Sequence, residues 1–125
     1  MNVAVLGAGG YLGSEVVRRA RISSEEEVLE FRDAAAFGAS DRTRAVGALS
    51  NCVGYYGDDG DRLQEANRDH AERAARLAAA SGATFVHVSS SAVFDASSSG
   101  RLTEERPPVP ATRYGKSKLE GELAV

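Results

Sequence analysis

A tyrosine and a lysine four residues apart are the first residues with an evident chemical use. Tyr114 and Lys118 would share one face of a helix, because residues four apart are neighbours on a helical surface. A tyrosine is a weak acid at neutral pH, and a neighbouring ammonium group favours its ionised form. Both lysines of the chain, Lys116 and Lys118, lie in this motif. The spacing predicts a tyrosine general acid or base assisted by a lysine, with a solvated surface pair as the alternative.

Three consecutive serines precede this pair in the chain. Residues 84–89 are rich in β-branched and aromatic side chains, which predicts a strand, and Ser89, Ser90 and Ser91 stand at its end. Side chains at the carboxyl end of a parallel strand can reach a bound ligand. A serine hydroxyl there can donate to a substrate carbonyl and stabilise the alkoxide that forms. A serine run by itself is usually a turn, but with Tyr114 and Lys118 it completes a catalytic set.

A glycine-rich segment near the N-terminus predicts a phosphate site. Gly7, Gly10 and Gly13 lie between an apolar strand and a helix, in the register Gly-x-x-Gly-x-x-Gly. The first glycine allows a sharp turn, the second lets the backbone approach a pyrophosphate, and the third lets the helix pack on the strand. The phosphates would rest at the helix N-terminus, beside Tyr11 and Leu12. We expect a dinucleotide here, and a tight turn without a ligand is the alternative.

The residues that follow the second predicted strand bear on the choice of dinucleotide. Arg32 and Asp33 come directly after residues 28–31. An acidic residue at this place accepts hydrogen bonds from the ribose hydroxyls, whereas an arginine pairs with a 2′-phosphate. Because Arg32 is the first residue beyond the strand, the sequence favours NADP over NAD. Solvated loop charges are the alternative for both residues.

The elements that must position these groups alternate between strand and helix. Strands are expected at residues 3–6, 28–31, 50–53 and 84–89, and helices at 12–22, at 61–81 and from about 110–114 past 119. Gly82 is expected to close the second helix. No clean periodicity spans residues 33–49, and residues 96–110 are expected to form a loop. This alternation predicts an α/β fold with a parallel sheet flanked by helices.

Composition excludes several classes of protein. The 125 residues carry a net charge of −3, so a basic surface for nucleic acid is not expected. One cysteine and two histidines exclude an internal disulfide and leave too few ligands for a familiar metal site. No segment reaches the roughly 18 apolar residues of a membrane span, and the first residues do not form a secretory signal. We therefore expect a cytoplasmic protein without a metal or a membrane partner.

Three segments resemble the extended short-chain dehydrogenase/reductase family. They are the glycine loop, the Ser-Ser-Ser-Ala-Val-Phe-Asp segment at 89–95 and the Tyr-Gly-Lys-Ser-Lys-Leu-Glu-Gly-Glu segment at 114–122. Residues 93–115 are most similar to the dTDP-4-dehydrorhamnose reductases, and residues 28–33 are similar to GDP-fucose synthase, which uses NADP. The resemblance implies a Rossmann-type sheet, a nucleotide-sugar substrate and hydride transfer from the reduced form of NADP or NAD to a 4-keto sugar.

The resemblance also implies roles for individual residues. Tyr114 would be the general acid or base, and Lys118 its electrostatic partner and a ligand of the cofactor ribose. The family's catalytic hydroxyl lies three residues before the valine of the Val-Phe pair. Since that valine is Val93, the hydroxyl is assigned to Ser90, with Ser91 as the alternative.

A further segment resembles the part of the family that lies beside the cofactor. It is Asn-Cys-Val-Gly-Tyr at 51–55, from which Asn51 and Val53 are expected to contact the cofactor. Cys52 replaces a small alanine and is expected only to pack in its strand. Asn67 matches an asparagine near the family's active site, and an ordinary polar helix residue is the alternative.

The chain departs from the family in two respects. Residues 23–49 are too few for the family's usual run of two strands and two helices, so at least one element is expected to be missing. The chain also ends at Val125, whereas family members continue into further strands and a substrate domain. Residues 1–125 are therefore expected to form a partial NAD(P)-binding domain. An epimerase or dehydratase and a non-catalytic NAD(P)-binding remnant stay as alternatives, and a homo-oligomer is left open.

Overall fold

The computed structural model describes residues 1–23, 25–94 and 100–125. Four strands and five α-helices are assigned there, together with two short 3₁₀ turns and one π turn. In chain order they are β1 (Asn2–Leu6), α1 (Tyr11–Ser23), β2 (Val28–Phe31), α2 (Ala34–Gly38), η1 (Asp41–Ala45), β3 (Val46–Asn51), α3 (Gly60–Gln64), η2 (Glu65–Asp69), α4 (His70–Ser81), β4 (Thr84–His87), η3 (Ser91–Val93) and α5 (Arg113–Ala124). Strand and helix alternate through most of the chain, as predicted.

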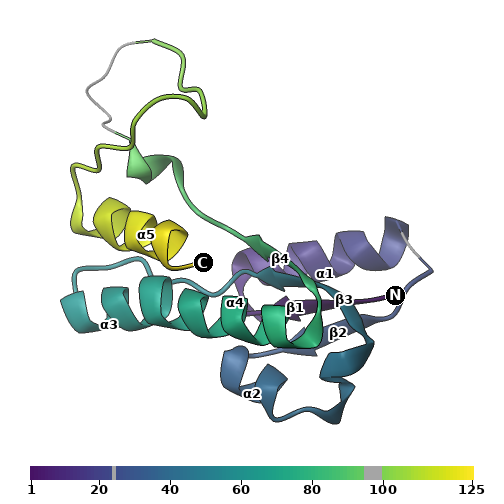
Figure 1. Ribbon diagram of the computed structural model, residues 1–125. Coiled ribbons are helices and arrows are strands. Elements are labelled where there is room, and N and C mark those ends of the chain that lie inside the picture. The colour runs from purple at the N-terminus through teal and green to yellow at the C-terminus, as the bar shows by residue number, and fades with distance from the viewer. Residues whose placement is uncertain (24, 95–99) are drawn as a thin grey trace.

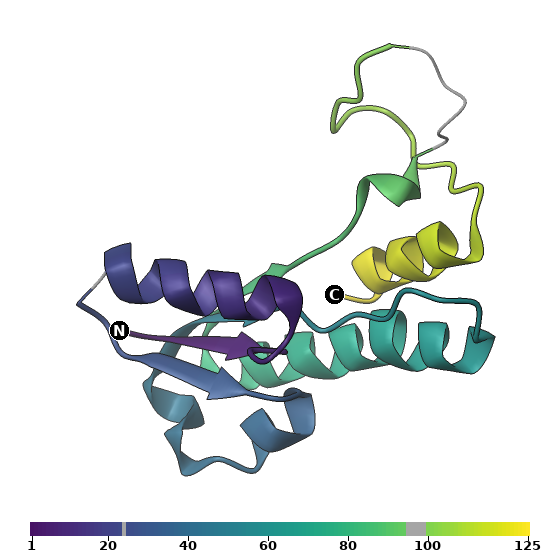
Figure 2. The ribbon, with the colours of Figure 1, turned by 180° about the vertical axis from the view of Figure 1, so that it is seen from behind.

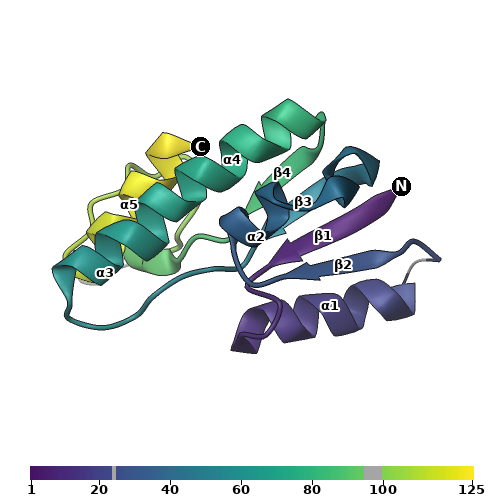
Figure 3. The ribbon, with the colours of Figure 1, turned by 90° about the horizontal axis from the view of Figure 1, so that it is seen from below.

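The four strands form one parallel sheet in the order β2-β1-β3-β4 (Figure 1). Helix α1 lies on one face of this sheet, and α2 and α4 lie on the other (Figure 3). The carboxyl ends of all four strands meet at one edge, because every pairing is parallel. The predicted α/β fold with a flanked parallel sheet is confirmed, and the residues that follow each strand are brought together.

Two apolar clusters hold the layers together. On the face covered by α2 and α4, the side chains of Leu6, Phe37 and Leu49 are fully buried. On the face covered by α1, Val5 and Val17 are buried against each other. Each such side chain contributes roughly 1.5–3 kcal/mol when it leaves water. The end of β1, from which the glycine loop departs, is therefore fixed from both sides.

The helix predicted at residues 61–81 is confirmed as a run from Gly60 to Ser81 that contains a π turn. A π turn inserts one extra residue into the helical register, and this one contains the fully buried Asn67. Gly82 closes the run with a φ of 72°, and its N–H donates to the carbonyls of the last turn. The left-handed cap predicted at Gly82 is therefore confirmed.

The third strand is not where the sequence suggested. Residues 46–51 form β3, whereas the strand was expected at 50–53. Gly47 and Ala48 lack the β-branched or aromatic side chains by which a strand is recognised in a sequence. A Cβ at Gly47 would meet the side chain of Met1. The fourth strand also ends early, at His87 rather than at Ser89.

The segment between β2 and β3 is short, as expected. Residues 32–45 hold a five-residue helix, α2, and the 3₁₀ turn η1. Asp33 caps α2, because its side chain accepts a hydrogen bond from the N–H of Ala36. One strand–helix pair of the run expected from the family resemblance is thus absent from these residues.

The outer edge of β4 has no neighbouring strand in the described part of the chain. Val86 on this strand is 51% exposed. Helix α5 packs against η2 and η3, and residues 100–112 project beyond it (Figure 2). No helix among the described residues is both long and apolar enough to cross a bilayer.

Candidate active site

The glycine loop joins β1 to α1 at the carboxyl edge of the sheet. Gly7 has a φ of 73°, a conformation that residues with a side chain rarely adopt. A Cβ at Gly13 would overlap the carbonyl oxygen of Gly7, so the helix can approach the strand only with glycine there. Gly9, Gly10 and Tyr11 are exposed. The open N-terminus of a 13-residue helix follows, which suits a phosphate group.

Two adjoining cavities lie beside this loop. The glycine-loop cavity, about 450 Å³, is lined by residues 7–10, Glu30, Arg32 and residues 52–54. The tyrosine cavity, about 440 Å³, is lined by residues 10–12, 52–56, Val88, Ser89, Tyr114 and Lys118. Gly10 and residues 52–54 line both cavities. Because they share these residues, the two cavities form one site that runs past the glycine loop from Arg32 to Lys118.

Lys118 is buried, with 4% of its surface exposed. Its Nζ donates to the carbonyl of Val88 at 2.7 Å. Burial lowers the pKa of Lys118, and the negative charge of Glu122 opposes that shift. Tyr114, one turn earlier on α5, is half-buried and lines the same cavity. The structure thus brings together the tyrosine and the lysine that the sequence singled out.

Asn67 connects the loop after β3 to the helix that carries Tyr114. Its side-chain oxygen accepts from the N–H of Tyr55 at 2.8 Å, and its amide donates to the Tyr55 carbonyl at 2.9 Å. The same amide donates to Oγ of Ser117 at 2.9 Å, and Ser117 in turn donates to the Tyr114 carbonyl at 2.8 Å. Asn67 does not line the tyrosine cavity. Its contribution is to hold the loop after β3 and helix α5, which form two walls of that cavity, in a fixed relative position.

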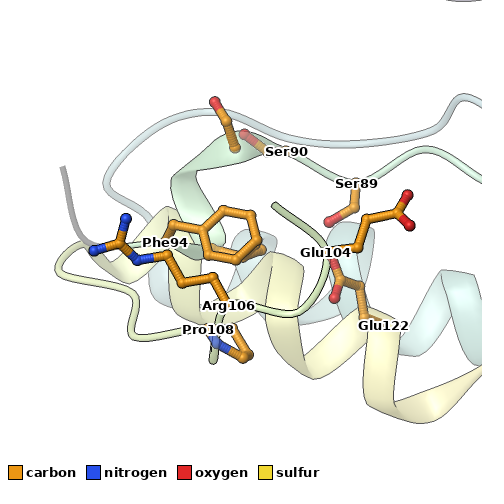
Figure 4. Close-up of a pocket in the computed structure, with 9 residues that line it drawn as sticks. Ser89, Ser90, Phe94, Glu104, Arg106, Pro108 and Glu122 are labelled. Carbon is orange, nitrogen blue, oxygen red and sulfur yellow. The ribbon is translucent and has the colours of Figure 1, made fainter. Parts of the chain in front are cut away.

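The three serines line a further cavity of about 540 Å³, the serine cavity (Figure 4). Oγ of Ser90 accepts from the N–H of Ala92 at 3.2 Å and caps the 3₁₀ turn η3. Oγ of Ser89 is buried without a hydrogen-bond partner among the described residues. Ser89 also lines the tyrosine cavity, whereas Ser90 and Ser91 do not. Of the three serines, Ser89 is therefore the one that shares a cavity with Tyr114 and Lys118, whereas Ser90, to which the resemblance assigns the catalytic hydroxyl, does not.

Asn51 is fully buried and lines neither the glycine-loop cavity nor the tyrosine cavity. Its side-chain oxygen accepts from the N–H of Val53 at 3.2 Å, and its amide lies 3.2 Å from Nδ1 of His87. Burial, together with the charge of Lys118, lowers the pKa of His87 to about 4, so the neutral ring accepts from Asn51. Val53 lines both cavities, and Asn51 acts on them by fixing Val53.

Arg32 and Asp33 have different structural roles. Arg32 lines the glycine-loop cavity, and Asp33 does not. One carboxylate oxygen of Asp33 accepts from the N–H of Ala36 at 2.9 Å, and the other accepts from Nε of Arg32 at 2.8 Å. These two hydrogen bonds, that from Ala36 first, lower the pKa of Asp33. Asp33 is thus a helix cap, and the charged residues that line the cavity are Arg32 and Glu30.

Sequence reasoning missed several residues of the cavity walls. Cys52 packs against the α1-side cluster, as expected, but it also lines both cavities. Gly54, Tyr56 and Val88 line the tyrosine cavity as well. The signal that could have found them was their place at the carboxyl ends of predicted strands: Gly54 and Tyr56 follow the strand predicted at 50–53, and Val88 is near the end of that predicted at 84–89. Within residues 1–23, 25–94 and 100–125, no group of three His, Cys, Asp or Glu side chains could hold a metal ion.

Comparison with known proteins identifies the family. A sequence profile described as the RmlD substrate binding domain matches residues 1–125. The chain belongs to this family. The dTDP-4-dehydrorhamnose reductase of Burkholderia thailandensis is 32% identical over an alignment that covers 100% of this chain and 45% of that protein. The predicted resemblance to these reductases is confirmed.

Solved structures of the RmlD relatives have the same fold. The structure of a dTDP-4-dehydrorhamnose reductase from Clostridium acetobutylicum matches with a TM-score of 0.87 at 26% identity, over 100% of this chain and 49% of that one. The reductase from Bacillus anthracis, in complex with NADP, matches with a TM-score of 0.83 at 24% identity, over 100% and 49%. The chain thus spans about half the length of the relatives it matches.

Proposed function

We propose that this member of the RmlD family is the cofactor-binding and proton-transferring part of an NAD(P)-dependent nucleotide-sugar reductase. The observation that carries this proposal is the convergence of Tyr114, Lys118 and Ser89 on one cavity that adjoins the glycine loop. The reductase names of the relatives support it. In this proposal residues 1–125 form a partial Rossmann domain, and substrate contacts outside these residues complete the reductase.

The residues present fit a nicotinamide dinucleotide. The positive φ of Gly7 and the crowded Cβ position of Gly13 are features of a turn that opens its amides toward phosphates. When such a cofactor is bound, its nicotinamide ring supplies hydride chemistry. Lys118 is close enough to the tyrosine cavity to serve the cofactor ribose as well as Tyr114.

The chain's own residues supply the proton. The Tyr114 hydroxyl donates its proton to the carbonyl oxygen of the sugar as negative charge develops there. The Lys118 ammonium stabilises the phenolate that is left, and its effect is strong because Lys118 is buried away from water. Ser89 lines the same cavity as Tyr114 and can donate a hydrogen bond to this carbonyl oxygen, whereas Ser90, to which the resemblance assigns that role, lines the serine cavity.

The cofactor preference in this proposal is NADP. Arg32 lines the glycine-loop cavity, and its guanidinium can pair with a 2′-phosphate. Asp33, the residue that would favour NAD, already accepts two hydrogen bonds. Similar solved structures are complexes with NADP or with NAD, so the proposed preference rests on Arg32. The substrate proposed from the relatives is a dTDP-4-keto sugar.

A second candidate is an NAD(P)-binding module that does not turn over. The 125 residues contain the glycine loop and the tyrosine cavity, and they span about half the length of the relatives they match. The two candidates share the cofactor site and differ in whether the 125 residues reduce a dTDP-4-keto sugar in the presence of NADPH. That reaction is measured from the loss of NADPH absorbance, and a rate equal to the enzyme-free rate would favour the module.

Titration calorimetry with NADPH and NADH tests the cofactor site. We expect NADPH to bind more tightly, and Arg32→Ala to weaken NADPH by about tenfold or more while leaving NADH nearly unchanged, since one charge-assisted contact is worth about 1.5–3 kcal/mol. Arg44→Ala, which changes an exposed arginine outside both cavities, is the matched control. Failure of both nucleotides to bind below millimolar concentration contradicts the proposed function. Tighter binding of NADH, unaffected by Arg32→Ala, contradicts the preference for NADP.

A further inference from the structure

All the tyrosines of the chain line the same cavity. The sequence has four tyrosines and no tryptophan, and the tyrosine cavity is lined by Tyr11, Tyr55, Tyr56 and Tyr114. Two of these rings are open to water, with Tyr11 99% exposed and Tyr56 82% exposed. Aromatic side chains gain free energy when they are covered. Exposed rings gathered at one cavity therefore indicate a ligand that covers them.

The backbone that carries Tyr56 is held in place. Both backbone polar groups of the preceding residue, Tyr55, are hydrogen-bonded to the fully buried Asn67. The guanidinium of Arg62 lies over the Tyr55 ring, 4.3 Å from its centre. Tyr56 is thus exposed without being on a loosely attached loop, and its ring is presented to the cavity by a fixed neighbour.

The ring of Tyr56 also contacts the ring of Tyr114. Their centres are 4.9 Å apart and their planes are 76° apart, an edge-to-face arrangement. In such an arrangement only one ring contributes its face. Tyr56 therefore keeps at least one face free, and its ring directly contacts the ring of the residue assigned to proton transfer.

We propose that the free face of Tyr56 binds the carbon–hydrogen face of the sugar ring and thereby presents the sugar carbonyl to Tyr114. This inference rests on the proposed function. A hexose ring has a face of C–H groups with slight positive charge, which matches the negative face of an aromatic ring. A group that covers Tyr56 must lie beside Tyr114, where the reacting carbon belongs. The nucleobase is separated from that carbon by a ribose and a diphosphate, so the sugar is the better occupant.

Binding of dTDP-rhamnose to the chain saturated with NADPH tests the proposal without relying on turnover. We expect Tyr56→Leu to weaken dTDP-rhamnose by about tenfold, the upper range for one aromatic contact, and Tyr56→Phe to restore the affinity because the ring is retained. The affinity for dTDP, which lacks the sugar, should be equal in all three proteins. Saturation-transfer NMR should show the strongest contact at the sugar-ring protons, and Tyr56→Leu should remove that signal.

The binding results for Tyr56→Leu separate the sugar contact of Tyr56 from the proposed function. Equal affinity of Tyr56→Leu and the unchanged chain for dTDP-rhamnose overturns the inference and leaves the proposed function standing. An equal loss for dTDP and dTDP-rhamnose also overturns it, because the ring would then contact the nucleotide. A loss of NADPH affinity of the same size overturns it as well, since the substitution would have disturbed the whole cavity. If the unchanged chain binds NADPH but no dTDP-rhamnose, the inference is overturned, because these residues then do not hold the sugar, while the proposed cofactor site stands. Failure to bind NADPH contradicts the proposed function itself.

Discussion

The ammonium of Lys118 is a charge held inside the protein. Its Nζ donates to the carbonyl of Val88, and burial lowers the pKa of Lys118. A buried charge acts on its neighbours through a medium of lower dielectric constant than water. In the proposed function, this burial is what lets the ammonium favour the phenolate of Tyr114 as the proton leaves.

Removal of the Tyr114 hydroxyl should separate catalysis from binding. In a steady-state assay with a dTDP-4-keto sugar and NADPH, we expect Tyr114→Phe to lower kcat by at least about 10²-fold, the lower range for general acid catalysis. The affinity for NADPH should stay nearly unchanged because the ring remains. Lys118→Ala should impair both the rate and NADPH binding, since its ammonium is assigned to both. Turnover of Tyr114→Phe at the rate of the unchanged chain would contradict the assignment.

The serines give a finer comparison in the same assay. Ser90→Ala should lower the rate clearly and Ser91→Ala much less, because the family resemblance assigns the hydroxyl to Ser90. Ser89→Ala is the variant that the structure adds, since its Oγ is buried without a hydrogen-bond partner among the described residues. A larger defect at Ser91 than at Ser90 would place the catalytic hydroxyl one residue later.

The two histidines should make the fold sensitive to mild acid. Burial lowers the pKa of both, that of His87 to about 4, and Nε2 of His70 accepts from the N–H of Ala34. The unfolded chain takes up protons near pH 6.5 and the folded chain resists them, so stability should fall as the pH drops from about 6.5 toward 4.

Thermal unfolding of His87→Gln and His70→Gln checks this expectation. A glutamine does not titrate, so each variant should lose less of its unfolding temperature between about pH 7 and pH 5 than the unchanged chain does. Parallel curves for all three proteins would show that neither histidine is linked to folding.

At the scale of elements, α5 depends on close approach to the π turn. A Cβ at Gly121 would collide with the backbone carbonyl of Asn67, which is part of η2. Backbone atoms cannot move aside as a flexible side chain can. The position of α5, and with it that of Tyr114 and Lys118, is therefore tied to the presence of glycine at 121.

Gly121→Ala should destabilise the protein by about 1–3 kcal/mol, the usual penalty of overpacking. Gly60→Ala is the matched control, because Gly60 also lies in a helix and a Cβ there meets nothing within 4 Å. It should be neutral or stabilising by up to about 1 kcal/mol, since alanine favours helix. Chemical denaturation measures both variants. Equal stability of Gly121→Ala and Gly60→Ala would show that α5 has room to shift.

At the scale of the molecule, the unpaired edge of β4 is the part of the sheet that favours association with other chains. The outer edge of β4 has no partner strand among the described residues, and Val86 is half exposed. An unpaired edge beside an exposed apolar side chain invites association with another chain. We therefore expect the 125-residue protein to be marginally stable and to associate as its concentration rises.

Val86→Lys should reduce that association, because a charge on an edge strand opposes pairing with a second strand. Val109→Lys is the control, since Val109 is 61% exposed but lies outside the sheet. Light scattering over a concentration series measures the mass of each variant. A monomer with one cooperative thermal transition in the unchanged chain would contradict the expectation and would indicate a self-sufficient domain.

Local features of this protein could be predicted from its sequence because they depend on residues close together in the chain. The turn at Gly7, the left-handed cap at Gly82 and the shared helix of Tyr114 and Lys118 follow from backbone freedom and helical periodicity. The alternation of strands and helices indicated the parallel sheet for the same reason. The family resemblance, carried by three short segments, was also available at this level.

The rest was decided only by contacts between distant segments. The start of β3 depends on its pairing with β1 and β4, and the part played by Asn67 depends on Tyr55 and Ser117, which the fold brings to it. The gathering of all four tyrosines at one cavity has no local sequence pattern, because Tyr11, the pair Tyr55 and Tyr56, and Tyr114 lie on three segments that are far apart in the chain. Burial and hydrogen-bond partners are properties of the packed molecule, and they distinguish Asp33 as a cap from Arg32 as a cavity residue.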